Sequence, residues 1–430
     1  MDTRQIMSQA LQALLDKGAD KVALWLTEKT KEEFNIVYKE LNLLRSVESQ
    51  NFNLIVIKDQ KQATTTLNQF DPESVAKAVE EVMANVLSSN ADPAFDISPY
   101  QEPQTFTDGP MEMDADLIVK RLEEFNAAMR KDYPSVYYDA ILSHTRARYQ
   151  FLNSNGVDFC QNWGYYGFTT MFTAKDGKQM SSFNYTSFET SELDNPLLDY
   201  NFTAELMRQI TQQTLTQPIP QNFTGEVLLC PFVTGELLDS LISQQFGSSG
   251  LLTNSSRFPD HVGQRVLDAR LSVYNKPSDP RLAIKDMVTS DGYVAQEGAI
   301  IENGVLLHYP IGLFTANKVG KARTFGTADS IVVEAGPTPL AEMIKSIREG
   351  VLCMRASFGN PNPNGDLSAV LKNSYYIKDG AIQFPISESM MSINLIDIFN
   401  NIVDISRETF NTGSSIYPYI QVKGAAISRK

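Results

Sequence analysis

The histidines are the residues that most narrow the chemistry open to this chain of 430 residues. There are three of them, His144, His261 and His308. No two lie within one helical turn of each other, so the His-Glu-x-x-His pattern that binds a catalytic zinc ion on one helix face is absent. None of the three lies near a nucleophile motif in the sequence. We therefore expect ordinary structural roles for them rather than general-base catalysis.

Glycine-rich phosphate-binding motifs are also missing. Neither G-x-x-x-x-G-K-[ST] nor G-x-G-x-x-G occurs in the chain. The run Gly247-Ser248-Ser249-Gly250 has the wrong spacing for the G-x-S-x-G nucleophile elbow and is typical of a turn that ends a helix. The run from Asn360 to Gly365 is similar to a calcium loop, but Leu371 stands at the twelfth position, where a carboxylate is needed. We expect a plain turn there.

The cysteine spacing and the net charge limit which compartment and which binding partners suit this chain. Cys160, Cys230 and Cys353 are odd in number and widely spaced, which favours reduced thiols over a disulfide framework or a zinc cage. The net charge of −14 disfavours contact with nucleic acid and with anionic membranes. We expect no signal peptide, because polar residues interrupt the first apolar stretch, and the longest apolar runs are far shorter than the ~20 residues of a membrane span. These features predict a cytoplasmic protein.

The pattern of apolar residues predicts an α+β protein, with an N-terminal α/β region followed by a C-terminal domain rich in antiparallel sheet. Residues 1–90 are expected to form a helix, several strands and a second helix, which Asp71 caps. Two of the strands are expected at 23–27 and 34–39, joined by a charged turn at 28–31.

A second and a third unit follow along the chain. Residues 91–216 contain a proline-rich linker, a helix and an antiparallel meander, and they either stand alone or form one N-terminal domain with 1–90. Residues 217–430 are expected to form the β-rich domain. A helix in this domain is predicted to begin with Thr234 as its N-cap and to end at Gly247.

The order of these elements and a series of short motifs resemble the TldD/PmbA family, also called the modulator-of-DNA-gyrase family. The resemblance covers almost the whole chain. Each motif is a simple turn-and-strand pattern, and their specificity comes from their order over more than two hundred residues. The motifs are Leu152-Asn153-Ser154-Asn155-Gly156, Gly263-Gln264-Arg265-Val266, Ser290-Asp291-Gly292, Ile301-Glu302-Asn303-Gly304-Val305-Leu306, Ile331-Val332-Val333-Glu334-Ala335-Gly336, Gly350-Val351-Leu352, Asn364-Gly365-Asp366-Leu367-Ser368 and Asn394-Leu395-Ile396-Asp397-Ile398.

The resemblance also implies where a zinc site would lie. TldD-like members of the family carry His-Glu-x-x-x-His on a helix of the C-terminal domain, and PmbA-like (TldE-like) members lack it. Alignment on residues 235–238 places the first His and the Glu at Asp239 and Ser240, and the second His at Gln244. Gln is a poor zinc ligand and Ser cannot replace a carboxylate base. We therefore expect these three residues to line a polar cleft without binding metal, as in the PmbA/TldE-like branch.

The function that the resemblance implies is that of a subunit in a cytosolic metallopeptidase that matures or degrades unfolded peptides. This chain would be non-catalytic by itself and bind no cofactor, and zinc is expected in a TldD-like paralogue that forms a heterodimer with it; a homodimer is the other expected assembly. Two alternatives stay open. One is an independent peptidase with a non-standard site, and the other is a binding or regulatory protein that modulates gyrase without direct DNA contact.

Overall fold

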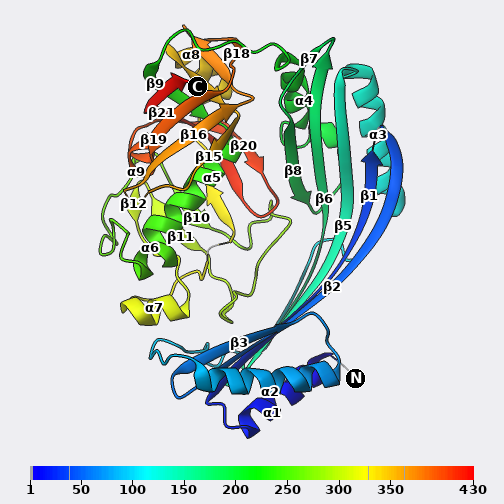
Figure 1. Cartoon of the computed structure of the whole chain (residues 1–430), viewed down its shortest axis with the longest axis vertical. Helices are drawn as coiled ribbons and strands as arrows, with labels where there is room; N and C mark the ends of the chain where they lie inside the picture. Colours follow the sequence, from blue (N-terminus) through cyan, green and yellow to red (C-terminus); the bar gives the residue numbers. More distant parts are fainter. Residues whose placement is uncertain (1–2, 38, 328, 363) are drawn as a thin grey trace.

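Two large β-sheets dominate the computed structural model, which describes residues 3–37, 39–327, 329–362 and 364–430 (Figure 1). One sheet is built from the N-terminal half of the chain and the other from the C-terminal half, and helices pack on both. The α+β class predicted from the sequence is confirmed. Among the described residues, no helix is both long and apolar enough to cross a membrane.

The elements follow one another in two groups. The N-terminal group is α1 (Thr3–Asp16), β1 (Lys21–Val37), β2 (Glu40–Lys58), β3 (Lys61–Leu67), α2 (Pro72–Ser88), β4 (Gln104–Asp108), α3 (Ala115–Asp132), β5 (Val136–Asn153), β6 (Asp158–Asp176), β7 (Gln179–Met180), β8 (Asn184–Thr190), η1 (Leu197–Asp199) and α4 (Thr203–Gln212). The C-terminal group is β9 (Phe223–Leu229), α5 (Pro231–Leu241), η2 (Ile242–Phe246), α6 (Ser248–Leu252), β10 (Val273–Asn275), β11 (Gly298–Glu302), β12 (Val305–Leu306), α7 (Leu313–Val319), β13 (Ile331–Val333), α8 (Leu340–Ser346), β14 (Glu349–Cys353), β15 (Arg355–Phe358), β16 (Asp366–Lys372), β17 (Tyr375–Lys378), β18 (Ala381–Pro385), β19 (Ser389–Asn394), α9 (Leu395–Asn400), β20 (Ile402–Asn411) and β21 (Ile416–Arg429).

The N-terminal sheet has strands of unusual length, in the order β3-β2-β1-β5-β6-β4, with β8 added to β6. The prediction of two short strands with a turn at 28–31 is wrong, because β1 runs unbroken from Lys21 to Val37 and pairs with β2 and β5 along its length. The charged side chains of residues 28–32 alternate between the two faces and stay partly exposed, so they tolerate the extended conformation. By contrast, the predicted cap is confirmed, since the Asp71 carboxylate accepts hydrogen bonds from two backbone amides of α2.

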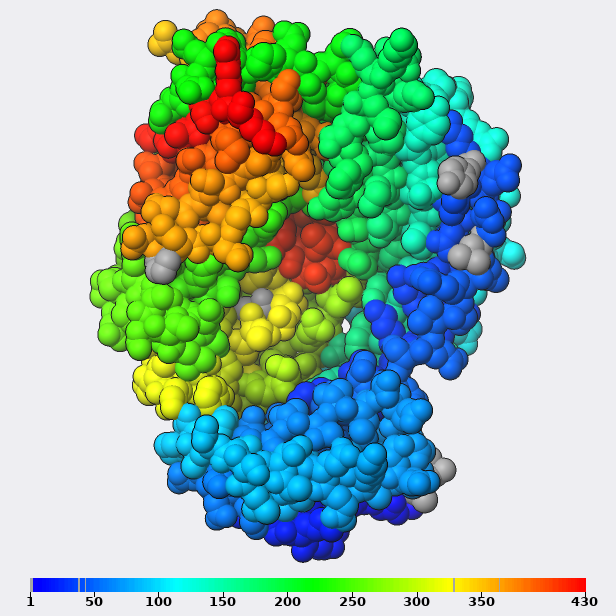
Figure 2. All heavy atoms as spheres, in the orientation of Figure 1, coloured from blue at the N-terminus to red at the C-terminus, as the bar shows by residue number. Residues whose placement is uncertain are grey.

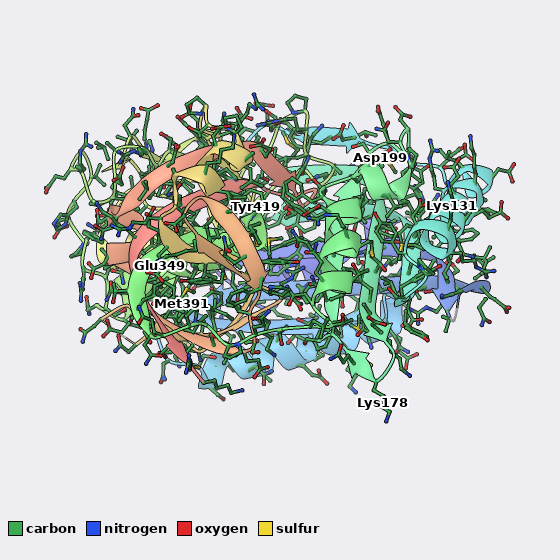
Figure 3. All side chains as sticks on the ribbon, turned by 90° about the horizontal axis from the view of Figure 1, so that it is seen from above. Lys131, Lys178, Asp199, Glu349, Met391 and Tyr419 are labelled. Carbon is green, nitrogen blue, oxygen red and sulfur yellow. The ribbon has the colours of Figure 1, made fainter. Side chains whose placement is uncertain are left out.

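Two hydrophobic clusters stabilise this sheet. At its lower end, α1 and α2 cover one face with side chains such as Leu14 and Val82 (Figure 1). At its upper end, α3 and α4 pack on the sheet through Phe125 and Met207, and this cluster continues into the C-terminal sheet. Figure 3 shows the two sheets side by side, with Met391 and Tyr419 in the C-terminal one and Lys131 at the far side of the N-terminal one.

In the C-terminal sheet, β21 is the central strand and β9 beside it leads directly into α5. The prediction of Thr234 as the N-cap of this helix is wrong, because α5 begins one turn earlier, after Cys230. Pro231 occupies the first helical position, where its fixed φ and missing N–H suit the helix. Thr234 is instead buried within the first turn.

The two sheets contact each other at two separate places. At the upper one, the backbone N–H of Glu189 donates to the carbonyl of Thr412 at 2.8 Å. At the lower one, Gln161 Nε2 donates to the carbonyl of Lys285, and the Phe95 and Phe314 rings stack with centroids 5.1 Å apart. Figure 2 shows that the surface between these contacts is hollowed, with the segment near residue 410 in its wall.

Candidate functional site

The polar face of α5 and η2 is the part of the structure where the sequence placed the candidate site. The leucines of α5 are fully buried, so the intervening polar side chains project from the opposite face of the helix. α5 continues into η2 as one π-helical turn, in which the N–H of Gly247 donates to the carbonyl of Ile242 at 2.7 Å. Single π turns inside helices are frequent at functional sites.

The three candidate residues have different surroundings. Gln244 Nε2 donates to Ser240 Oγ at 3.3 Å, so these two side chains bond to each other along the helix. Asp239 accepts a hydrogen bond from the Tyr417 hydroxyl at 3.0 Å, a contact between α5 and β21. Of the three, only Asp239 lies among the residues that line the adjoining pocket. The structure therefore brings Ser240 and Gln244 together and directs Asp239 elsewhere.

This adjoining pocket, which we call the hydroxyl pocket, has a volume of about 470 Å³. It lies between α5, η2 and α6 on one side and the β20–β21 turn on the other. Its polar lining consists of serine, threonine and tyrosine hydroxyls and two carboxylates. The lining residues are Asp239, Ile242, Ser243, Gly247, Ser248, Ser249, Pro310, Thr327, Asp329, Ile331, Ser414, Ser415 and Tyr417. Apart from Pro310, the lining comes from three stretches, 239–249, 327–331 and 414–417, which lie far apart in the sequence, so no single local motif could reveal the whole pocket.

The carboxylates of this region sit in an environment that disfavours their charge. Burial raises the pKa of Asp239, and the hydrogen bond from Tyr417 opposes that shift only in part. Burial likewise raises the pKa of Tyr417, and the neighbouring negative charge of Asp239 adds to the effect. Burial raises the pKa of Asp286 to about 6, and the charge of Asp329, a residue of the hydroxyl pocket, adds to this effect. Surrounding protein atoms therefore cause these shifts, even though the Asp239 carboxylate is exposed to the pocket.

Because Asp286 has a raised pKa, the stability of the protein should depend on pH in a defined direction. The folded state holds the proton on this carboxyl more tightly than the unfolded chain, whose value is near 3.8. The contribution of Asp286 to the free energy of unfolding should therefore fall as the pH rises from about 4 to about 7. Asp286→Asn should remove this part of the dependence, which urea unfolding of both proteins across that range would measure. Equal slopes for the two proteins would contradict the assignment.

The donor set on the helix does not fit a zinc ion. Tetrahedral zinc sites use Cys, His and carboxylate ligands, whereas here Ser240 and Gln244 bond to each other and the Asp239 carboxylate is engaged by Tyr417. Throughout the part of the chain that the structure describes, no three His, Cys, Asp or Glu side chains gather in a way that could hold a metal ion.

The histidines are dispersed, as their spacing suggested. His144 lies in β5 with Nε2 at 2.8 Å from the carbonyl of Pro110, and His308 Nδ1 is 2.8 Å from the carbonyl of Ala299. His261 packs edge-on against the Phe258 ring. Each histidine thus contacts its own local backbone or ring, and none of them lines the hydroxyl pocket.

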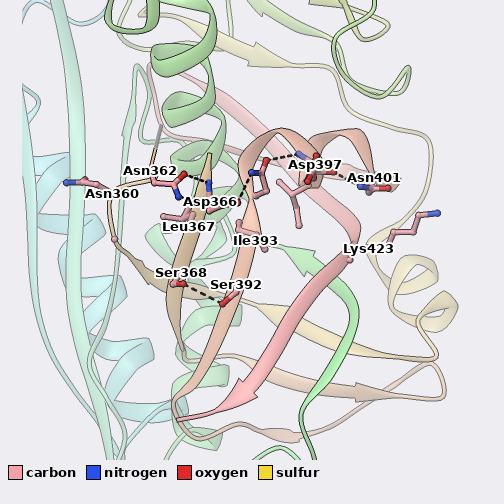
Figure 4. Close-up of a pocket in the computed structure, with 14 residues that line it drawn as sticks. Asn360, Asn362, Asp366, Leu367, Ser368, Ser392, Ile393, Asp397, Asn401 and Lys423 are labelled. Carbon is pink, nitrogen blue, oxygen red and sulfur yellow. Dashed lines mark hydrogen bonds between the residues drawn. The ribbon is translucent and has the colours of Figure 1, made fainter. Parts of the chain in front are cut away.

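A second cavity, of about 760 Å³, lies beside the run that is similar to a calcium loop (Figure 4). The Asn362 side-chain oxygen accepts from the backbone amides of Asn364 and Asp366 at 2.9 and 3.0 Å, which closes a turn. Side-chain hydrogen bonds from Asn394 and Asn362 lower the pKa of Asp366. Because these polar groups satisfy one another, they support the predicted turn; residue 363 of the run lies outside the described residues.

Fold and site together define a two-sheet α+β protein with a pocket lined by hydroxyls and carboxylates beside the first helix of its C-terminal half. Residues 223–429 match the model of the PmbA/TldA metallopeptidase C-terminal domain. The metalloprotease PmbA homolog of Haemophilus influenzae is 22% identical, with 98% of this chain and 96% of the relative covered. An uncharacterised Methanocaldococcus jannaschii protein, MJ0231, is 21% identical over 88% of this chain and 90% of its own length.

Solved structures share the whole fold. TldE from Thermococcus kodakarensis superposes with a TM-score of 0.83 at 16% identity, covering 98% of this chain and 100% of that one. A Bacteroides thetaiotaomicron protein described as a candidate modulator of DNA gyrase gives a TM-score of 0.87 at 17% identity, with 99% of each chain covered. Residues 223–429 thus match the C-terminal domain of this metallopeptidase family, and the resemblance of the chain to the TldD/PmbA family, which its motifs indicated, is confirmed.

Proposed function

We propose that this chain is a PmbA/TldE-like subunit of a cytosolic metallopeptidase that acts on unfolded peptides, and that it is non-catalytic by itself. The observation that carries the proposal is the chemistry of Asp239, Ser240 and Gln244 on the α5–η2 helix. By the resemblance to the family, these residues fall where its zinc motif would lie, and their side chains do not offer its ligands or its base. A zinc-bearing TldD-like chain would provide the metal, the activated water and the general base.

The contribution of this chain would be to bind and orient the peptide. The hydroxyl pocket offers many hydrogen-bond donors and acceptors to a peptide backbone. The N-terminal sheet also has a free edge. Its outermost strand, β3, pairs only with residues 52–58 of β2, and no described strand pairs with the outer side of residues 40–51. An extended peptide or a partner strand can add to such an edge through main-chain hydrogen bonds.

Co-purification from the native cell tests the pairing. A tagged chain should recover a TldD-like paralogue in equal amount, and metal analysis should find zinc in proportion to the paralogue rather than to this chain. Native mass spectrometry gives the stoichiometry of the assembly. A preparation that contains only copies of this chain, with one zinc ion per copy, would overturn the proposal in favour of an independent metallopeptidase.

A further inference from the structure

Two arginines project side by side from the middle of β5, far in sequence from the hydroxyl pocket. Arg146 and Arg148 are two residues apart and therefore lie on the same face of the strand. With their neighbours they line a cavity of about 260 Å³, which we call the arginine pocket. Its lining residues are Glu28, Thr30, Met111, Arg146, Ala147, Arg148 and Asn162.

Neither arginine side chain has an ion pair or a hydrogen bond with any described residue. The Nε atom of Arg148 is buried as well as unpartnered, and leaving a buried charged donor without an acceptor costs stability. This is unexpected in a chain with 51 acidic and 37 basic residues, where carboxylates are plentiful. Arg121 and Arg323, for example, both bond to carboxylates at 2.7 Å.

Glu28 is the only acidic residue of the arginine pocket. It lies directly across from Arg148 in the pairing of β1 with β5. Its carboxylate, however, accepts a hydrogen bond from Gln50 Nε2 at 3.0 Å and so points toward β2. On the other side of Arg148, the partner in β6 is Asn162, whose amide can donate to a ligand. The donors in this pocket therefore outnumber the acceptors available to them.

The wall of the arginine pocket is built by a close approach of backbone segments. Gly164 in β6 lies against Pro110, and a Cβ atom at this glycine would be only 1.7 Å from the Pro110 carbonyl oxygen. The same carbonyl contacts His144 Nε2, which holds Met111 beside the arginines. A residue larger than glycine at position 164 would therefore push this wall apart.

The arginine pocket opens on a different face of the sheet from the one that the C-terminal half contacts nearby. Gln161, the neighbour of Asn162 in β6, bonds to the backbone of Lys285 and Met287. Because successive side chains of a strand point to opposite faces, Asn162 and the two arginines face away from that segment. The pocket is therefore separate from the hydroxyl pocket and from the proposed peptidase function.

We propose that the arginine pocket binds a small oxyanion, a phosphate or a carboxylate group, between the guanidinium groups of Arg146 and Arg148. Guanidinium groups bind such anions through paired N–H···O hydrogen bonds. An oxyanion would supply acceptors for these two guanidinium groups, and the Thr30 hydroxyl and the Asn162 amide line the same cavity as further donors.

Isothermal titration of the full chain with sodium phosphate and with sodium acetate, at constant ionic strength in chloride, tests the proposal. Saturable one-to-one binding of either probe is expected, and the probe that binds identifies the anion as phosphate or carboxylate. Arg146→Gln and Arg148→Gln should each weaken binding by about tenfold or more, the usual effect of losing a charged hydrogen bond. Arg265→Gln, at an exposed arginine of the C-terminal half, should leave binding unchanged.

Two further variants separate binding from folding. Arg148→Lys keeps the charge but loses the planar donor pair, so it should fold and still bind more weakly than the wild type. Glu28→Gln should tighten binding, because it removes the one negative charge from the pocket. The proposal is overturned by the absence of saturable binding, by unchanged binding in both Arg→Gln variants, or by a Glu28→Gln variant that unfolds without tightening, which would make Glu28 the true partner of Arg148.

Discussion

The purified chain alone is expected to leave unfolded peptides intact, and adding a zinc-bearing TldD-like partner is expected to raise cleavage by about three orders of magnitude. A metal ion that activates water and polarises a carbonyl lowers the barrier by several kcal/mol, and each 1.4 kcal/mol is about tenfold in rate. The proposal places Ser240 and Gln244 where the base and one ligand would stand, so that contribution is expected from the partner chain. A fluorogenic unfolded peptide, assayed with each chain alone and with the mixture, measures the effect.

The matched control is the Asp239→Ala variant of this chain, which changes a residue of the hydroxyl pocket. Asp239→Ala should leave the isolated chain as inactive as before, because the proposed function gives this carboxylate no catalytic role. In the complex, the same variant should change the KM for the peptide more than kcat, since Asp239 lines the pocket without supplying the reaction chemistry. Chelator-sensitive cleavage by the chain alone, abolished by Asp239→Ala, would instead identify it as an independent peptidase.

The second large effect is expected at the upper contact between the sheets, where Arg355→Ala should lower the free energy of unfolding by about 3 kcal/mol. The Arg355 guanidinium lies between two rings, with centroid distances of 4.2 Å to Tyr185 and 4.0 Å to Phe232. Its Nε donates to the Asn184 side chain at 3.0 Å, and a second nitrogen donates to the carbonyl of Tyr185. Urea or thermal unfolding of both proteins would measure the loss.

Arg348→Ala is the control for this prediction, because Arg348 is an exposed arginine of the same domain. Its removal should change the free energy of unfolding by no more than about 0.5 kcal/mol. Arg355→Lys should fall between the two alanine variants, since an ammonium group stacks less well and cannot form both hydrogen bonds of the guanidinium in the same geometry. An Arg355→Ala protein as stable as the control would show that the contact contributes little to joining the sheets.

Local signals in the sequence were sufficient where the structure depends on neighbouring residues. Asp71 before Pro72 predicted the cap of α2, because the cap bonds only to amides two and three residues ahead. One failure arose where distant residues decide. Residues 28–31 have a turn-like composition, yet pairing with β2 and β5 on both sides holds them in β1. The failure at α5 has a local cause instead, because Thr234 is a good cap by type, but Pro231 sets the earlier start.

The sequence by itself determined what chemistry this chain lacks, because counting three scattered histidines and reading Ser240 and Gln244 at the motif positions requires no fold. Only the tertiary structure decided what surrounds those positions. It places Tyr417 on Asp239 across 178 residues of chain and encloses them with Asp329 and the serines of the β20–β21 turn. The physical reason is that burial and long-range contacts set both the shape of a pocket and the pKa values within it, and neither is encoded in residues that are adjacent in the sequence.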